Sequence, residues 1–275
     1  MNSIGKATIL WVLAVIITMA AAVYQKRTGP TYPVRVERDV AGKMMKFDLI
    51  RTYNTGTQAA VKLIVPDTAV SGEITFRRFK SYDKWTTEVM QRSGDTLIGL
   101  LPGLPAAGKV MYQVTLKQGG TAVLLNDHPA ILRYKGAVPA YILIPHIFFM
   151  FFAMLLSTRA GLEALFRGKQ TYVLAWITLI FLFIGGLILG PIVQKFAFDA
   201  YWTGWPFGHD LTDNKSLVAF IFWVIALIVV ARNRQRRTWT IVAAIITFIV
   251  FLIPHSMLGS EIDYTKEAPP SGVAK

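Results

Sequence analysis

The sequence predicts a polytopic α-helical membrane protein with five transmembrane helices and an all-β sandwich domain inserted between the first helix and the second. Hydrophobic residues make up 53% of the chain and charged residues only 16%, which is too apolar for an ordinary soluble protein of 275 residues. This apolar excess is concentrated in five long runs without charge. Between the first two runs, the sequence changes to short β-rich segments separated by turn residues.

The five uncharged runs reach or approach the roughly 20 residues that a bilayer-spanning helix needs. They cover residues 7–23, 138–157, 172–193, 217–230 and 238–253. The fourth run is short, but uncharged neighbours on both sides lengthen the helix that it predicts. We therefore expect an N-terminal membrane anchor helix (1–30), a β-sandwich (31–136), a four-helix transmembrane bundle (137–258) and an outer C-terminal tail (259–275).

Basic residues in the short loops predict the orientation of these helices. The loops at 157–170 and 231–237 hold seven Lys and Arg residues, so the positive-inside rule makes their side cytoplasmic. The N-terminus is then cytoplasmic, while residues 24–137 and the C-terminus are periplasmic or extracytoplasmic, and a bacterial inner membrane fits this pattern. The first helix is read as an uncleaved anchor because its apolar run is long for a signal peptide, which is the alternative.

Composition excludes several kinds of chemistry. The chain has no cysteine, so it has no disulfide, thiolate nucleophile or Cys-ligated metal. Its net charge of +13 follows from the topology, because the basic residues are spread over inner loops and an outer domain. We therefore expect a lipid bilayer and protein partners, but no nucleic acid.

The inserted domain has seven or more predicted strands, punctuated by turns such as RSGD and KQGG. The stretch GLLPGLPAAGKVMYQVTL, which contains Tyr112, resembles the tyrosine corner of immunoglobulin-like and fibronectin type III-like domains. This resemblance implies a buried Tyr112 and a domain that serves as a spacer or docking surface, with Trp85 as a candidate core residue. A basic cluster is read as a solvated face, with an acidic partner or anionic lipid as the alternative: Arg77, Arg78, Lys80 and Lys84.

The membrane runs carry no Asp, Glu, Lys or Arg in their central regions. Pumps and coupled transporters normally need such groups, so a transporter or channel component is disfavoured. Gly186 and Gly190 predict a helix-packing face, and Pro191 predicts a kink or an end in the same helix.

The tetrapeptide Leu-Ile-Pro-His occurs twice and ends at His146 and at His255. At 1.5 Å per residue, His255 lies about 27 Å along a helix from Arg237, near the outer boundary of the bilayer. His146 reaches the same level if Pro145 lies in the first turn of a helix that continues past Arg159. We therefore expect these two histidines and His209 to converge at the outer face of the bundle.

Carboxylates follow the histidines in the outer loops, so a metal site is one prediction. Histidine and carboxylate ligands without sulfur suit zinc, copper or iron, and two facing histidines suit haem. The candidate ligands are His146, His209, His255, Asp210, Asp213 and Glu261. The alternative is interface structure, in which Asp210 and Asp213 cap a helix and the nearby aromatic residues form a membrane belt.

No hydrolase, nucleotide-binding or kinase motif is present, so the chain is not predicted to be an enzyme. We expect an accessory or scaffold subunit that docks an extracytoplasmic partner through its β-sandwich. The alternative is a redox or metal-handling membrane protein that uses the six candidate ligands.

Overall fold

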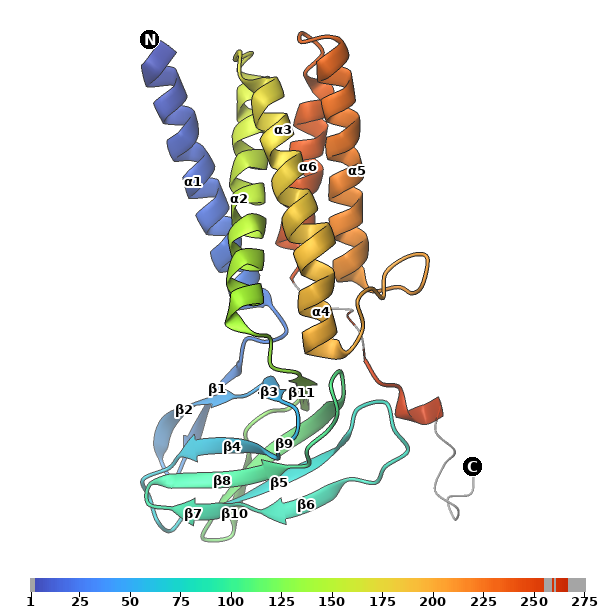
Figure 1. The fold of residues 1–275 in the computed structure, drawn as a ribbon. Helices are drawn as coiled ribbons and strands as arrows, with labels where there is room; N and C mark the ends of the chain where they lie inside the picture. The colour runs from blue at the N-terminus through green and yellow to red at the C-terminus, as the bar shows by residue number, and fades with distance from the viewer. Residues whose placement is uncertain (1–2, 255–258, 260, 267–275) are drawn as a thin grey trace. The chain divides into compact units, whose positions relative to one another are not determined.

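The computed structural model describes residues 3–254, 259 and 261–266. The chain divides into two compact units (Figure 1). The helical unit comprises Met1–Pro30 and Val138–Ser260, and the β unit comprises Thr31–Ala137 and Glu261–Lys275. Residues 267–275 of the predicted tail lie outside the described residues.

The helical unit consists of long helices whose side chains are mostly apolar. They are α1 (Ser3–Thr28), α2 (Ala140–Leu165), α3 (Thr171–Leu182), a π-helical segment (Phe183–Leu189), α4 (Gly190–Phe198), α5 (Leu211–Arg232) and α6 (Thr238–Leu252). Four stretches are long and apolar enough to cross a membrane: Gly5–Thr28, Ala140–Leu165, Thr171–Phe198 and Leu211–Arg232. The predicted fifth span corresponds to α6, whose 15 residues make it a shorter apolar helix.

The two Leu-Ile-Pro-His copies lie in different positions relative to their helices: the first lies inside α2, and the second begins where α6 ends. Pro145 lies inside α2, which begins after the N-cap residue Pro139, so the prediction that Pro145 lies in the first turn was wrong. At the other copy, α6 ends at Leu252 and Ile253 is extended. The following Pro254 explains this end, because a proline disfavours helical backbone in the residue before it.

Small residues bring the helices of the bundle close together. A methyl group on Gly161 of α2 would lie 2.5 Å from the Cβ atom of Ala244 in α6. The indole of Trp223 in α5 is fully buried and donates to the Thr247 hydroxyl of α6 at 2.8 Å. Close backbone approach and interhelical hydrogen bonds are the usual sources of helix association in a bilayer.

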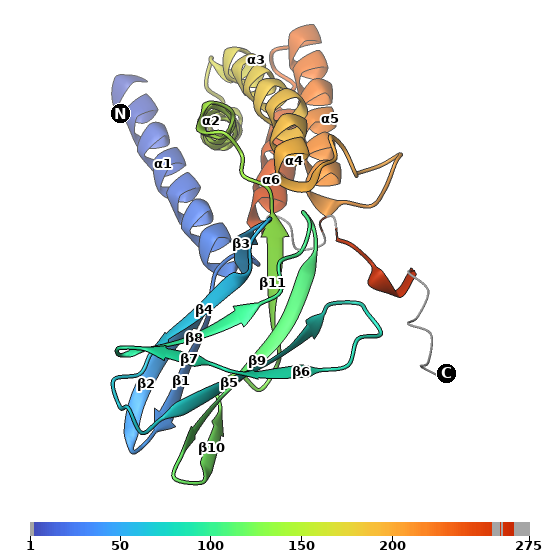
Figure 2. The ribbon, with the colours of Figure 1, turned by 60° about the horizontal axis from the view of Figure 1, so that its bottom comes forward.

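The β unit contains eleven described strands in three sheets (Figure 2). A hairpin pairs β1 (Val34–Val40) with β2 (Lys43–Leu49). The largest sheet has the order β3-β11-β9-β5-β6, with β10 on β9, and the third has the order β4-β8-β7. The bounds of these strands are β3 (Thr52–Asn54), β4 (Ala59–Ile64), β5 (Ser71–Arg78), β6 (Thr86–Val89), β7 (Gln91–Ser93), β8 (Thr96–Leu101), β9 (Lys109–Gln118), β10 (Thr121–Leu124) and β11 (Ala130–Lys135).

Alternation along the strands builds one core between the sheets. In β5, Ile74 and Phe76 are buried while their neighbours are only partly covered. The predicted RSGD and KQGG turns are confirmed, because they join β7 to β8 and β9 to β10. Positive φ angles at Gly94, Gly119 and Gly120 explain why these turns need glycine.

Candidate functional site

A cavity of about 130 Å³ lies within the helical unit, between α2, the π-helical segment, α4 and α5. Its polar lining includes three of the predicted ligands together with side chains from α4 and α5. The polar residues are His146, Gln194, Asp210, Thr212, Asp213 and Ser216. The apolar run of α2 and the first turn of α5 thus contribute to one polar site.

The π-helical segment supplies the partner of His146. The Nδ1 atom of His146 lies 3.0 Å from the carbonyl oxygen of Gly185, which also accepts from the Gly190 amide. Because a carbonyl can only accept, Nδ1 of His146 carries the hydrogen and Nε2 retains a lone pair. A histidine held in this way has the tautomer that a metal ligand or proton acceptor requires.

The carboxylate of Asp213 organises the loop that leads into α5. Its Oδ2 atom accepts from the amides of Thr203 and Gly204 at 2.7 and 3.0 Å. Gly204 has no room for a side chain, because a Cβ atom there would lie 2.6 Å from that of Asp213. Asn214 accepts from the Trp205 amide at 2.6 Å and holds the same loop.

Asp210 is the N-cap of α5, as the structural alternative predicted. Its Oδ1 atom accepts from the Thr212 amide at 2.7 Å, and its Oδ2 atom accepts from the Thr203 hydroxyl at 3.3 Å. Gln194 of α4 donates to that same hydroxyl at 2.7 Å. The two buried carboxylates of this cavity therefore already serve as structural acceptors.

The other predicted ligands are not found together at this cavity. His209 is exposed in the loop before α5 and does not line the cavity. His255 lies outside the described residues, and Glu261 belongs to the β unit. Within the described part of the chain, no group of three or more His, Cys, Asp or Glu side chains is arranged to hold a metal ion.

Two buried cationic side chains of the helical unit were missed by the sequence reasoning. Lys215 is 5% exposed and donates to the carbonyl of Ile253 at 2.8 Å, where α6 has just ended. Arg159 is fully buried and donates to Glu163 one turn further along α2 at 2.7 Å. The i,i+4 spacing of Arg159 and Glu163 was the available signal for that pair, whereas no local spacing announces the contact of Lys215 with Ile253.

In the β unit, residues 261–266 form a C-terminal clasp on the sheet. The carboxylate of Glu261 accepts from the ammonium groups of both Lys80 and Lys109. Burial alone would raise the pKa of Glu261, but these hydrogen bonds outweigh it and hold the pKa below its usual range. The guanidinium of Arg78 lies 4.4 Å from the ring centroid of Tyr264, so a cation–π contact adds to the clasp.

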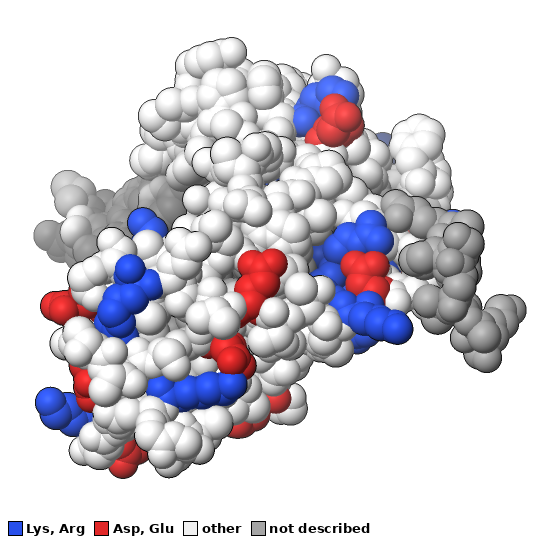
Figure 3. Space-filling model, turned by 90° about the horizontal axis from the view of Figure 1, so that it is seen from below, with Lys and Arg blue, Asp and Glu red and all other residues white. Residues whose placement is uncertain are grey.

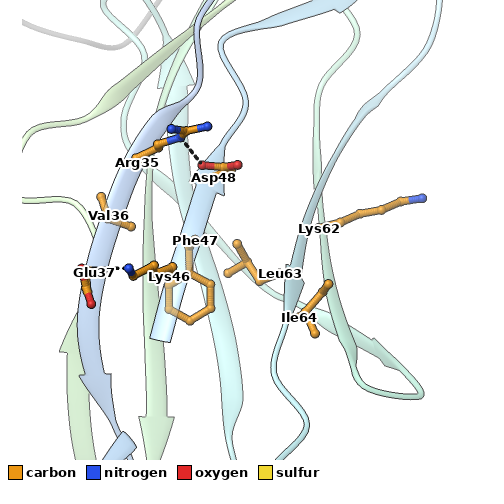
Figure 4. Close-up of a pocket in the computed structure, with 9 residues that line it drawn as sticks. All are labelled: Arg35, Val36, Glu37, Lys46, Phe47, Asp48, Lys62, Leu63 and Ile64. Carbon is orange, nitrogen blue, oxygen red and sulfur yellow. Dashed lines mark ion pairs between the residues drawn. The ribbon is translucent and has the colours of Figure 1, made fainter. Parts of the chain in front are cut away.

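A larger groove of the β unit lies between β1, β2 and β4, with a volume of about 620 Å³ (Figure 4). Two cross-strand ion pairs line it, Arg35 with Asp48 at 3.3 Å and Glu37 with Lys46 at 3.8 Å. These charges neutralise one another on exposed strands. The groove therefore has the character of a solvated surface rather than a site with convergent free groups.

The basic cluster after β5 is also largely compensated. Arg78 pairs with Asp83 at 2.7 Å, and Lys80 pairs with Glu261. On the face that Figure 3 shows, basic and acidic side chains are interspersed. This distribution agrees with the reading of the cluster as a solvated face.

No protein-family model, curated protein or solved structure matches this chain.

Proposed function

We propose that this protein is an accessory or scaffold subunit of a bacterial inner-membrane complex, and that its β unit docks an extracytoplasmic partner. The observation that carries the proposal is the exposed edge of the six-stranded sheet at β6. All four residues of this strand are exposed, and β6 ends the sheet (Figure 2). An edge strand with open backbone groups is a common place for another chain to pair.

The side chains around β6 have the composition of an interface. Trp85 is 40% exposed, although it was a candidate core residue, and the guanidinium of Arg77 lies 4.9 Å from its ring centroid. Tyr82 and Val89 are 53% and 72% exposed. Trp, Tyr and Arg are the residues that most often dominate binding energy, so this edge is the best candidate docking surface.

An immunoglobulin-like or fibronectin type III-like sandwich remains our proposal for the β unit. Three observations support it. Its strands pair antiparallel except for β3, which pairs parallel with β11, and Tyr112 is completely buried. Such domains commonly act as docking modules, which agrees with the proposed role.

Five membrane crossings with a cytoplasmic N-terminus are also part of the proposal. The clasp supports them, because Glu261 bonds to Lys80 and Lys109 and must share their side of the membrane. The chain between β11 and the clasp must then cross an even number of times. With three longer candidate spans in this part of the chain, α6 supplies the fourth crossing.

Native electrophoresis of the full chain from its own membranes tests the docking role. We expect wild-type protein in mild detergent to migrate as a complex larger than the monomer. The double variant Trp85→Ser/Val89→Ser removes apolar contacts at β6 and should migrate as the monomer. The matched control is Ile64→Ser, since Ile64 is 69% exposed on another sheet. Equal migration of all three proteins would contradict the proposed surface.

A metal or redox role is the second candidate, and one observation favours it. His146, Asp210 and Asp213 line a single cavity, and the Nε2 lone pair of His146 is not used by the Gly185 contact. Copper, zinc or iron would suit histidine and carboxylate ligands, and haem iron would suit histidine.

Metal analysis with an absorption spectrum separates this second candidate from a pure scaffold. The measurement compares wild-type protein with His146→Ala and with Gln170→Ala, a control at the other end of the helical unit. Stoichiometric metal or a haem band that is lost only in His146→Ala would favour the metal role. Absence of metal from all three after reconstitution would exclude it.

A further inference from the structure

We propose that the helical unit binds the phosphate group of an anionic phospholipid in a pocket between the end of α2 and the start of α6. This inference rests on the helices spanning a bilayer and is independent of the docking role. The α2–α3 and α5–α6 connections lie at the same end of the helical unit (Figure 1). Their side is the one that the positive-inside rule makes cytoplasmic.

The pocket has a volume of about 540 Å³ and an amphipathic lining. Arg167, Arg237, Gln235 and Thr238 supply hydrogen-bond donors, whereas Leu165 and Ile241 supply apolar surface. Arginine forms bidentate, charge-assisted hydrogen bonds to phosphate. Apolar walls next to such donors suit a ligand that has acyl chains below a phosphate, which is the chemistry of a phospholipid.

The charge of this pocket is uncompensated. Among the described residues, no carboxylate forms an ion pair with Arg167 or Arg237. Glu163 at this end of α2 is already engaged by Arg159 and by the Gln170 amide. The N-cap of α6 makes no side-chain cap bond, so the first amides of that helix add to a positive field at the same place.

Arg167 occupies a backbone position that glycine fits well, which makes a glycine variant a useful test. Arg167 has a φ angle of +52° and terminates α2, a position that usually holds glycine. At the next residue, Gly168, a Cβ atom would lie 1.9 Å from Oε1 of Glu163, so a side chain there would displace a carboxylate that is already engaged. No packing requirement of this kind applies to the exposed Arg167.

Aromatic residues place the pocket at the level of lipid headgroups. Trp239 in the first turn of α6 is 42% exposed, and Trp176 in α3 is 44% exposed. Trp176 donates to the hydroxyl of Tyr172 at 2.8 Å, and the Arg234 guanidinium lies 3.3 Å from the ring centroid of Tyr172. Trp and Tyr gather at the membrane interface, so phosphate groups of the lipid are at this depth.

Lipid binding by the full chain in detergent tests the proposal, with phosphatidylglycerol and phosphatidylcholine as the two lipids. We expect wild-type protein to prefer phosphatidylglycerol, and Arg167→Gly and Arg237→Gln each to weaken its binding about fivefold. The control Arg236→Gln removes one charge from the same loop but does not line the pocket, so its affinity should stay within about twofold.

Two features keep this test decisive. Arg167→Gly relieves the strained backbone, so we expect its thermal midpoint to be equal to or above that of the wild type, and unfolding cannot explain weaker binding. The second feature is competition with inorganic phosphate at millimolar concentration, which has the phosphate group but no acyl chain. The proposal is overturned if Arg236→Gln weakens binding as much as the pocket variants. It is also overturned if inorganic phosphate displaces the lipid fully, since the ligand would then be free phosphate.

Discussion

Tyr112 connects strand β9 to the segment between β2 and β3 through one hydrogen bond. Its side chain is fully buried, and its hydroxyl donates to the carbonyl of Ile50 at 2.7 Å. Burial raises the pKa of Tyr112, so the hydroxyl remains a donor at all ordinary pH values. Because Ile50 lies where the chain passes from β2 to β3, this bond secures the start of the domain to the central strand β9.

Replacing Tyr112 with phenylalanine should therefore destabilise the β unit. Tyr112→Phe removes the donor and leaves the partly buried carbonyl of Ile50 without this partner, which costs about 1 kcal/mol. Denaturant unfolding of the full chain measures the loss. Tyr82→Phe is the control, because Tyr82 is 53% exposed and should change stability by less than about 0.5 kcal/mol. Equal losses of stability in Tyr112→Phe and Tyr82→Phe would show that the hydrogen bond to Ile50 does not stabilise the β unit.

Glu261 should make the C-terminal clasp sensitive to acid. Because the folded-state pKa of Glu261 is lowered, its contribution is complete above the ordinary value of about 4.3 and is lost as the pH falls through the lowered value. A nitroxide on Thr265→Cys should thus become mobile on acidification. In a Glu261→Gln background it should already be mobile at pH 7. A label on Lys62→Cys should respond in neither case, and an acid response there would indicate general unfolding.

At the scale of elements, the π-helical segment decides how α2 and α3 pack. A Cβ atom on Gly185 would lie 2.9 Å from Sδ of Met150 and 3.0 Å from Cβ of Phe149. The sequence predicted that Gly186 and Gly190 form the packing face; a Cβ atom on Gly186 would meet Met150 and Ser216 at 3.8 Å, which is an ordinary contact distance. Gly185 therefore makes the closest approach to α2, which the four-residue spacing of Gly186 and Gly190 did not predict.

Two neighbouring glycines therefore provide a matched pair. Gly185→Ala should destabilise the helical unit by about 1–3 kcal/mol, because the added methyl overlaps α2 in a closely packed contact. Gly186→Ala should be tolerated, since its methyl meets only ordinary van der Waals neighbours. Thermal unfolding in detergent compares the two. A larger loss of stability for Gly186→Ala than for Gly185→Ala would contradict the close packing of Gly185 against α2.

The bounds of α2 show how a charged pair can extend a helix beyond an uncharged run. The second uncharged run ends at Ser157, and the level predicted for His146 required a helix that continues past Arg159. The helix does continue, to Leu165, and Arg159 and Glu163 pair with each other inside the bundle. When the partner lies one turn away, the pair can be buried and the helix continues.

At the scale of the whole molecule, the central prediction is the number of membrane crossings. The chain contains no cysteine, so single cysteines report accessibility without background. Lys62→Cys and Lys266→Cys should react with a membrane-impermeant maleimide in cells whose outer membrane is permeabilised. Arg236→Cys should react only after the inner membrane is opened. If Lys266→Cys, like Arg236→Cys, reacts only after the inner membrane is opened, α6 does not cross the membrane.

The sequence by itself determined the properties that depend on local pattern. Uncharged runs identified the apolar helices, turn glycines identified two hairpins, and Asp210 was recognised as a possible cap of α5. Each of these features depends on residues within a few positions of one another, so composition and spacing are sufficient.

Only the tertiary structure decided which distant residues meet. It places Lys215 against the end of α6, Glu261 between Lys80 and Lys109, and His146 on a carbonyl that a π turn exposes. These partners are separated by 38 to 181 residues. Their pairing follows from packing, in which a buried polar group must find a partner wherever the fold brings one. No periodicity in the sequence carries that information.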